Sequence, residues 1–286
     1  MKKSILDFKE MKQKGEKITL LTCYDYLTAK YEEQAGVDII LVGDSLGNVM
    51  LGYKNTIPVT MDEMITYTKS VRRGAPDTFI AGDMPFMSYQ VSDEQAVSNA
   101  GRFIKEAGCD CVKLEGAEPA ILSRIRAISD AGILVIGHVG LTPQLEAKIG
   151  GCRAQGKSFD AARIILEQAK QVEESGAFAV IAEGVPAIVG KLLCRNLKIP
   201  VIGIGAGSYT DGQILVCADM LGLYEDSVPK FVKKYANLGA EMREAFRTYC
   251  EEVKSGKFPD NSEHTYKIKD EEAARIEELF GDKVLI

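Results

Sequence analysis

One phrase recurs four times along the chain: the end of a helical pattern, a glycine, a short apolar run and a polar residue. Glycine is the residue that most often follows the last turn of a helix. A continuous apolar run of this length is typical of a parallel strand buried on both faces. The repeat therefore predicts a fold of helix and strand units, and its copies are EEQAGVDIILVGD (32–44), KEAGCDCVKLEG (105–116), SDAGILVIGH (129–138) and EESGAFAVIAEG (173–184).

Further apolar runs bring the expected strands to eight: KITLLTC (17–23), TFIAGD (78–83), PVIGIG (200–205) and, as the weakest pattern, ILVCAD (214–219). Capping boxes at Thr60–Glu63 and Ser92–Gln95 predict the starts of two helices, and a third helix is expected from Phe159 to Glu174. Eight alternating units in about 250 residues predict an α/β fold, a (β/α)8 TIM barrel. An open, doubly wound sheet remains the alternative, because sequence does not show whether a sheet closes.

We expect the barrel to form a single domain over residues 1–266, with a C-terminal amphipathic extension over residues 267–286. The extension would place apolar side chains on one side of a helix, either packed on its own barrel or in contact with another subunit. A long helix is expected before it, over about 229–255, with an apolar stripe that belongs to the core.

Five expected strands end in residues that can take part in proton or metal chemistry: Asp44, Asp83, Glu115, His138 and Glu183. In a barrel the carboxyl ends of the strands form the active site. Polar residues also mark where any buried strand reaches solvent, which is the alternative explanation for each of them. Four carboxylates on one rim would repel one another, so we expect a positive group among them.

Carboxylates at a barrel mouth suit a hard cation such as Mg2+. A 2-oxo acid can chelate such an ion, which would stabilise the enolate formed when the neighbouring carbon loses a proton. Lys113 has the same strand parity as Glu115, so it should point inward and pair with the substrate carboxylate; the alternative is a lysine that extends to solvent. Glu183 follows a very apolar run, where desolvation favours the protonated form, and we therefore expect it to be the general base.

Composition narrows the class of protein. The chain has 286 residues and a formal net charge of −6, which does not favour a nucleic-acid partner and leaves a small molecule as the expected ligand. The first fifteen residues contain no long apolar run, so we expect no signal peptide or membrane span and a cytoplasmic protein. The seven cysteines are scattered and should be inert thiols; with only two histidines, a zinc site is not expected.

Two glycine-rich stretches resemble nucleotide-binding motifs. GCRAQGKS (151–158) fits a phosphate-binding loop, but the nearest expected strand ends at His138, and a proline and charges intervene. GIGAG (203–207) lacks the third glycine of the dinucleotide motif. We therefore interpret the first as a mobile loop at the active-site mouth and the second as a tight loop after the seventh strand.

Long blocks of this sequence follow one another in a recognisable order: VGDSLGNVMLGYKNTIPVTMDEM (42–64), VRRGAP (71–76), GDMPFMSY (82–89), VKLEG (112–116), GHVGLTPQ (137–144) and PVIGIGAGSYTDGQILV (200–216). They resemble the ketopantoate hydroxymethyltransferase family. The resemblance implies a (β/α)8 barrel of the phosphoenolpyruvate/pyruvate-type superfamily that forms a large homo-oligomer, expected to be a decamer. It also implies transfer of a hydroxymethyl group from 5,10-methylenetetrahydrofolate to 3-methyl-2-oxobutanoate in pantothenate biosynthesis, with Mg2+.

The resemblance also implies roles for individual residues. Asp44, Asp83 and Glu115 match the metal positions. Asp44, Ser45, Asp83 and Lys113 match the oxo-acid site, with His138 near the substrate. Glu183, in the phrase EGVP (183–186), matches the proton acceptor.

The alternatives are another magnesium-dependent oxo-acid lyase or mutase of the same superfamily, a nucleotide-hydrolysing protein built on GCRAQGKS, and a catalytically inactive barrel. The first would need no folate, and the second would depend on Lys157.

Overall fold

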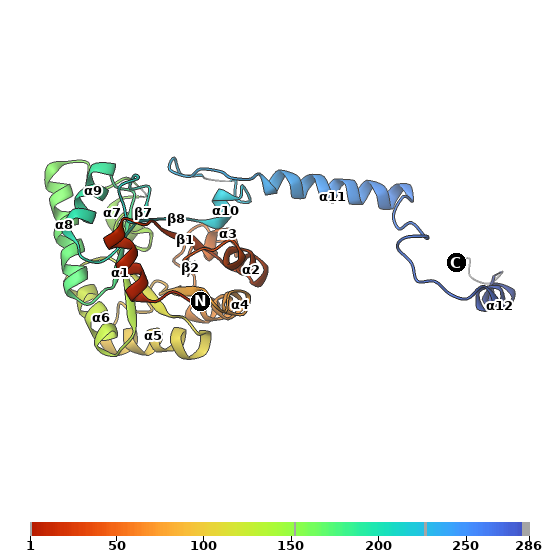
Figure 1. The fold of residues 1–286 in the computed structure, drawn as a ribbon, viewed down its shortest axis with the longest axis horizontal. Coiled ribbons are helices and arrows are strands. Elements are labelled where there is room, and N and C mark those ends of the chain that lie inside the picture. The colour runs from red at the N-terminus through yellow and green to blue at the C-terminus, as the bar shows by residue number, and fades with distance from the viewer. Residues whose placement is uncertain (1, 152, 226–227, 282–286) are drawn as a thin grey trace. The chain divides into compact units, whose positions relative to one another are not determined.

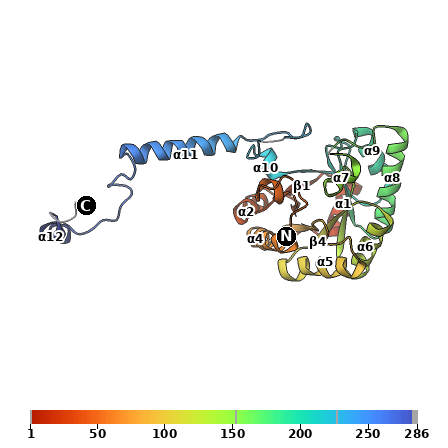
Figure 2. The ribbon, with the colours of Figure 1, turned by 180° about the vertical axis from the view of Figure 1, so that it is seen from behind.

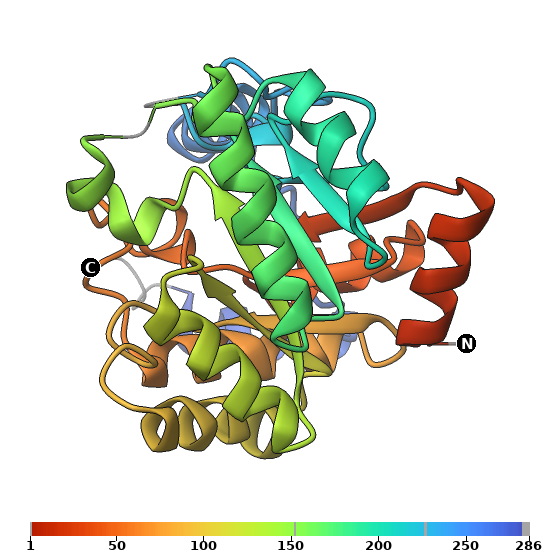
Figure 3. The same ribbon diagram turned by 90° about the vertical axis from the view of Figure 1, so that its left-hand side faces the viewer.

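The computed structural model describes residues 2–151, 153–225 and 228–281, and within them eight parallel strands close into a barrel (Figures 1 and 3). The strands pair in sequence order, and β1 pairs with β8 to complete the ring. The prediction of a (β/α)8 barrel is confirmed, and the open sheet is excluded. The strands are β1 (Ile18–Thr22), β2 (Ile39–Val42), β3 (Phe79–Asp83), β4 (Cys111–Glu115), β5 (Leu134–Gly140), β6 (Ala179–Glu183), β7 (Val201–Ile204) and β8 (Gly212–Leu215).

Helices lie on the outside of the barrel, as Figures 1 and 2 show. Those connecting successive strands include α2 (Tyr26–Gln34), α3 (Leu46–Val49), α4 (Met61–Gly74), α5 (Asp93–Ala107), α6 (Pro119–Asp130), α7 (Glu146–Ile149), α8 (Phe159–Glu174) and α9 (Ala187–Asn196), with the short η1 (Pro143–Leu145) before α7. The remaining helices are α1 (Ile5–Lys14), α10 (Cys217–Met220), α11 (Leu238–Ser255) and α12 (Asp270–Phe280). No described helix is both long and apolar enough to cross a bilayer.

The local signals in the sequence correspond to observed helix ends. The Thr60 hydroxyl accepts a hydrogen bond from the Glu63 amide, and the Glu63 carboxylate accepts one from the Thr60 amide, which completes the capping box of α4. Ser92 caps α5, but the Gln95 side chain bonds to the Val91 amide and not to that of Ser92. The glycines of the repeated phrase all adopt positive φ, as helix-ending residues do: Gly36, Gly108, Gly132 and Gly176.

Two apolar layers hold the barrel together. Inward side chains from the strands fill the interior, and outward side chains pack against the helices. On β4, for example, Cys111 belongs to the inner layer and Val112 and Leu114 to the outer one. Helix α1 adds Phe8 to the inner layer, where its ring lies edge-on to Phe79 with 5.2 Å between centroids. The inner layer leaves one end of the barrel, formed by the last residues of the strands, to polar side chains.

The connection from β7 to β8 departs from the expected alternation. No helix forms between the two strands, because only the residues from Gly205 to Asp211 join them. The strands share just two residue pairs, Ile202 with Gly212 and Gly203 with Gln213.

The predicted eighth strand was too long at its end. ILVCAD was expected to be extended throughout, whereas β8 ends at Leu215 and α10 begins at Cys217. The Val216 carbonyl accepts hydrogen bonds from the amides of Asp219 and Met220, which turns the chain, and the Cys217 amide donates to the Thr22 hydroxyl. The contacts of Val216 are local, whereas Thr22 lies 195 positions from Cys217, and a local pattern does not reveal such a contact.

The chain divides into two compact units, residues 1–236 and 237–286. The second unit contains α11 and α12, neither of which has a buried residue. The prediction of a helix from about residue 229 was wrong at its start, because the amides of Tyr235 and Ala236 donate to the Met220 carbonyl, which holds that segment outside a helix. The apolar stripe of α11, expected in the core, is exposed at Met242, Phe246, Tyr249 and Val253.

The cysteines of the described residues are free thiols. Cys23, Cys109, Cys111 and Cys217 are buried, as expected, whereas Cys194 is half-buried and Cys250 is exposed. Cys152 lies outside the described residues.

Candidate active site

A cavity of about 950 Å³ opens at the carboxyl ends of the strands. Every residue that the sequence predicted for the site lines it: Asp44, Ser45, Asp83, Lys113, Glu115, His138 and Glu183. They come from five neighbouring strands, β2 to β6, or the residues directly after them. The barrel thus gathers side chains that are up to 139 positions apart from Asp44 to Glu183, because each is placed where an inward strand position reaches the open end.

Lys113 is the positive group at the centre of this site. Its Nζ lies 2.8 and 3.0 Å from the two carboxylate oxygens of Asp83 and 2.9 Å from Oε1 of Glu115. All three side chains are buried. Burial disfavours the ammonium form, but the surrounding carboxylates outweigh it and raise the pKa of Lys113 well above its ordinary value. The inward-pointing lysine is therefore confirmed, and its first partners are the protein's own carboxylates.

Asp44 is a second buried carboxyl beside this ion pair. Its amide donates to Oδ2 of Asp83 at 3.1 Å, and its own Oδ2 accepts a hydrogen bond from the Gln144 side chain at 3.0 Å. Burial, followed by the negative charges of Asp83 and Glu115, raises the pKa of Asp44 well above its ordinary value. Burial likewise raises the pKa of Asp83, against the effect of Lys113. A cation placed at Asp44 and Asp83 would relieve this unfavourable accumulation of negative charge.

Glu115, the third predicted metal ligand, already has several partners of its own. Oε1 of Glu115 lies close to both Lys113 and His138, and Oε2 accepts a hydrogen bond from the Gln144 amide at 3.1 Å. Across the described residues, no three side chains of the metal-binding types surround a common point. Mg2+ needs only one or two protein carboxylates and keeps several waters, so Asp44 and Asp83 fit it chemically. Both oxygens of Glu115 and both oxygens of Asp83 already have partners, so each of these side chains would have to exchange one to bind the ion directly.

His138 joins the charged cluster to Glu183. Its Nδ1 lies 3.1 Å from Oε1 of Glu115, and its Nε2 lies 3.2 Å from Oε2 of Glu183. The second contact has the distance of an ion pair but not the geometry of a hydrogen bond. Although burial opposes the charged imidazole, Glu115 and Glu183 raise the pKa of His138 to about 9. The ring is a cation between two carboxylates.

Glu183 is the most accessible carboxyl of this group. Its side chain is 15% exposed, against 2% for Asp83 and Glu115. The Leu141 amide donates to its backbone carbonyl, which holds the end of β6 beside the end of β5. The close approach of these strand ends depends on Gly140, which has φ +93°. A Cβ at this position would lie 2.4 Å from the Glu183 carbonyl oxygen. The strand ends thus place Glu183 at the surface of the cavity.

The structure adds polar residues that the sequence reasoning did not single out. The Gln144 side chain donates to Asp44 and to the Met84 carbonyl and accepts a hydrogen bond from the Tyr89 hydroxyl at 2.7 Å. Ser45 is hydrogen-bonded to the Tyr24 hydroxyl at 2.8 Å. Gln144 lies in the block GHVGLTPQ and Tyr89 in GDMPFMSY. Both blocks carry the family resemblance, but the sequence reasoning assigned no role to these two residues. Tyr24 carried no comparable signal.

The rest of the cavity is mostly apolar. Strands β6 to β8 and the segments after them contribute Ile181, Ile204, Ile214, Val216, Pro229 and Phe231. Apart from Glu183 at the end of β6, Asp219 of α10 is the one acidic residue among the described cavity residues of this half, and burial raises its pKa to about 6. The sequence reasoning missed this half because its apolar residues looked like ordinary strand core.

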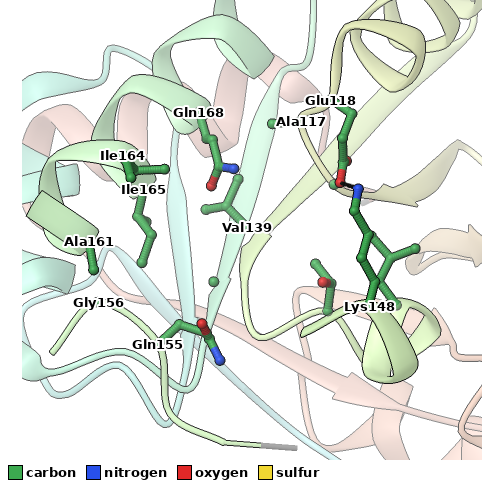
Figure 4. Close-up of a pocket in the computed structure, with 14 residues that line it drawn as sticks. Ala117, Glu118, Val139, Lys148, Gln155, Gly156, Ala161, Ile164, Ile165 and Gln168 are labelled. Carbon is green, nitrogen blue, oxygen red and sulfur yellow. Dashed lines mark hydrogen bonds and ion pairs between the residues drawn. The ribbon is translucent and has the colours of Figure 1, made fainter. Parts of the chain in front are cut away.

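A second, smaller cavity of about 250 Å³ lies between the end of β4, the end of β5 and α8. Glu118 and Lys148 form an ion pair on one side, and Ile164 and Ile165 stand on the other (Figure 4). Gly156 of GCRAQGKS also lines it, whereas Arg153 and Lys157 are exposed. The segment before Gly151 is α7 and not a strand, which agrees with our interpretation of GCRAQGKS as a loop and not a phosphate site.

Known proteins resemble this chain over most of its length. Residues 2–261 match the family model described as ketopantoate hydroxymethyltransferase. The 3-methyl-2-oxobutanoate hydroxymethyltransferase of Alkaliphilus metalliredigens is 53% identical over 281 residues, which are 98% of each chain. That of Clostridium botulinum is 51% identical over 276 residues, 96% of this chain and 100% of the relative.

A solved structure of phosphonopyruvate hydrolase, in complex with oxalate and Mg++, has a similar fold. Its TM-score is 0.59 at 13% identity, with 96% of this chain and 98% of that chain covered. At this identity the likeness concerns the fold alone. The match of the family model over most of the chain, together with relatives that are more than half identical over its full length, settles the assignment: the chain belongs to the ketopantoate hydroxymethyltransferase family.

Proposed function

We propose that the protein transfers a hydroxymethyl group from 5,10-methylenetetrahydrofolate to 3-methyl-2-oxobutanoate, which yields ketopantoate and tetrahydrofolate for pantothenate biosynthesis. The observation that carries this proposal is that one cavity holds Lys113, paired with Glu115, and Glu183, with His138 in contact with both carboxylates. An anionic oxo acid needs a positive group to bind, and loss of its C3 proton needs a base nearby. The site holds both.

The oxo acid binds in the charged half of the cavity. Lys113 supplies the positive charge for its carboxylate, and Asp44, Ser45, Asp83 and His138 complete the pocket around it. Asp44, Asp83 and Glu115 would hold Mg2+. When bound, Mg2+ draws electron density from the oxo acid and so eases loss of the C3 proton.

Glu183 removes that proton. Its carboxylate reaches the cavity, and the positive His138 ring beside it holds it in place. The electron pair left on C3 attacks the methylene carbon of the folate, and a carbon–carbon bond forms. The methylene carbon is bonded to two folate nitrogens: the bond to one breaks as the carbon–carbon bond forms, and water then displaces the other and supplies the hydroxyl oxygen. The two nitrogens take up one proton from Glu183 and one from that water, and tetrahydrofolate leaves.

Changing Glu183 tests this role directly. Glu183→Gln should abolish exchange of the C3 hydrogen of 3-methyl-2-oxobutanoate with solvent deuterium, because an amide is not a base, and should leave oxo-acid binding nearly intact. Proton NMR measures the exchange and calorimetry the binding. Glu174→Gln, a change on the exposed end of α8, is the matched control and should exchange normally. Undiminished exchange in Glu183→Gln would remove Glu183 from this role.

Removal of metal and of folate tests the overall reaction. The unmodified protein should form ketopantoate only when methylenetetrahydrofolate is present, and EDTA should stop the reaction until excess Mg2+ is restored. Chromatography of the products measures both effects. Consumption of the oxo acid without folate would favour a lyase or mutase of the same superfamily.

We further propose that the protein is cytoplasmic and assembles as a homo-oligomer, with a decamer as the expected form. The family resemblance supports this assembly, and so does the exposed apolar stripe of α11.

A further inference from the structure

The cavity has two halves of opposite chemistry. Strands β2 to β5 contribute the charged cluster around Lys113, whereas β6 to β8 and the segments that follow contribute mostly apolar side chains. Glu183, on β6, stands at the boundary, with His138 on one side and Ile204 of the paired strand β7 on the other. Cavities that hold drug-sized ligands measure about 300 to 1,000 Å³. At about 950 Å³ this cavity has room for a much larger molecule than a five-carbon oxo acid.

Two charged residues, Asp219 and Lys230, line the apolar half beyond Glu183, and Asp219 is the carboxylate of the two. Its residue is 6% exposed and lines the cavity, yet its carboxylate accepts no hydrogen bond from any residue that the structure describes. Lys234 is the cation that acts on it, and burial is the stronger influence. Because Asp219 lines the cavity, its carboxylate can accept hydrogen bonds from a ligand that displaces water there. The two free oxygens of Asp219 therefore indicate a ligand with two hydrogen-bond donors side by side.

We propose that the apolar half of the cavity binds the reduced pteridine ring of the one-carbon cosubstrate, and that Asp219 accepts hydrogen bonds from the ring's N3–H and 2-amino groups. This inference rests on the proposed function. A 2-amino-4-oxopyrimidine presents these two donors in parallel, with a spacing that matches the oxygens of a carboxylate. The flat ring suits a pocket walled by Ile204, Ile214 and Phe231.

The charges of the two halves favour binding of each substrate in a different half of the cavity. The carboxylate of the oxo acid is attracted to Lys113 and repelled by Asp219, whereas the uncharged donor edge of the pteridine has the opposite preference. The two reactants then meet at the boundary, where Glu183 stands. Asp219 is thus a binding residue for the cosubstrate and takes no part in removal of the C3 proton.

Asp219→Asn should weaken binding of the folate without changing the reaction of the oxo acid. An amide offers one acceptor and one donor to the pteridine's pair of donors, so the KM for methylenetetrahydrofolate should rise about 10- to 100-fold. Deuterium exchange at C3 of the oxo acid, which needs no folate, should stay within about twofold of the unmodified rate. Asp77→Asn removes an exposed carboxylate before β3, at the other end of the barrel, and should change neither quantity. An unchanged KM for the folate, or an equal rise in the KM for the oxo acid, would overturn the inference.

A second measurement does not depend on a variant. Reduced 6-methylpterin, which carries the pteridine ring but no benzoylglutamate, should inhibit the unmodified protein in competition with the folate and not with the oxo acid. Competition with the oxo acid alone would place the ring in the charged half and contradict the proposal. Failure of the proposed function is a separate result, because the unmodified protein would then form no ketopantoate at all.

Discussion

Glu32 of α2 is a buried carboxyl in a place unrelated to the cavity. Neither of its oxygens has a hydrogen-bond partner among the described residues, and the residue is 6% exposed. Burial, with a smaller effect of Asp25, raises the pKa of Glu32 from its ordinary value of 4.5 to about 8. The buried thiols Cys23 and Cys217 lie close enough to respond to its charge. At neutral pH, Glu32 is therefore protonated in the folded chain and ionised in the unfolded one.

This difference makes stability depend on pH. Between about pH 4.5 and pH 8 the folded state binds more protons at Glu32 than the unfolded state, so the free energy of unfolding falls as pH rises. Glu32→Gln removes that effect. From pH 5 to pH 7 the unmodified protein should lose about 2 kcal/mol relative to the variant.

Urea unfolding of both proteins across this pH range measures the difference. Glu16→Gln, at an exposed position, is the control, and its free-energy difference from the unmodified protein should stay constant with pH. A constant difference for Glu32→Gln as well would show that Glu32 is ionised in the folded state.

Most residues of the charged cluster could be predicted from the sequence, whereas the residues of the rest of the cavity could not. Asp44, Asp83, Glu115 and Glu183 each end an apolar run or follow its last residue, and in a parallel barrel this local position determines where the side chain points. Gln144 lies in the short η1 and Asp219 in the short α10. Their positions depend on contacts with Tyr89, Met84 and Thr22, which are far away in the sequence.

At the scale of the elements, the ends of β5 and β6 pack closely at the active site. Gly140→Ala would force a residue with a Cβ into φ +93° and place that Cβ 2.4 Å from the Glu183 carbonyl oxygen. We expect a loss of about 2 to 4 kcal/mol in the free energy of unfolding, from backbone strain and displacement of the strand end together. Exchange at C3 should slow as well, because Glu183 moves with the strand.

Gly132→Ala distinguishes backbone strain from displacement of the strand end. Gly132 has φ +84°, but a Cβ there would meet nothing within 4 Å. This variant should lose only about 1 kcal/mol, the cost of the backbone conformation, and keep its exchange rate. Urea unfolding measures both. Equal losses in the two variants would show that contact with β6 is unimportant.

The elements also show where sequence patterns are weakest. The start and the end of α8 agree with the predicted Phe159 and Glu174, because Ser158 caps it locally. The end of β8 and the start of α11 were both predicted wrongly. In each case, hydrogen bonds to a distant or non-helical segment decided the boundary, and amphipathic periodicity alone extends past it.

At the scale of the whole molecule, α11 presents one apolar face. Met242, Phe246, Tyr249 and Val253 share this face and are between 44% and 61% exposed. If the face joins subunits, as we propose, the unmodified protein should sediment as an oligomer, and Phe246→Asp should shift it toward smaller species because a charge would be buried at the contact.

Analytical ultracentrifugation measures the mass of each. Glu251→Ala changes the opposite face of α11 and should leave the mass unchanged. An unmodified protein that sediments as a monomer would contradict the proposed assembly, and an unaffected Phe246→Asp would place the subunit contact elsewhere.

Helix α1 has a consequence for how the chain is made. Synthesis produces this helix before any strand of the barrel, but it is held by residues that come much later: Phe8 packs against Phe79, and Lys12 pairs at 2.5 Å with Asp211, 199 positions further on. Asp211 directly precedes β8, so α1 gains this contact only when the ribosome has delivered the last strand. A nascent chain that pauses earlier leaves Phe8 without its complete site and is a substrate for chaperones. A helix that is made before every strand is thus among the last parts of the barrel to be secured.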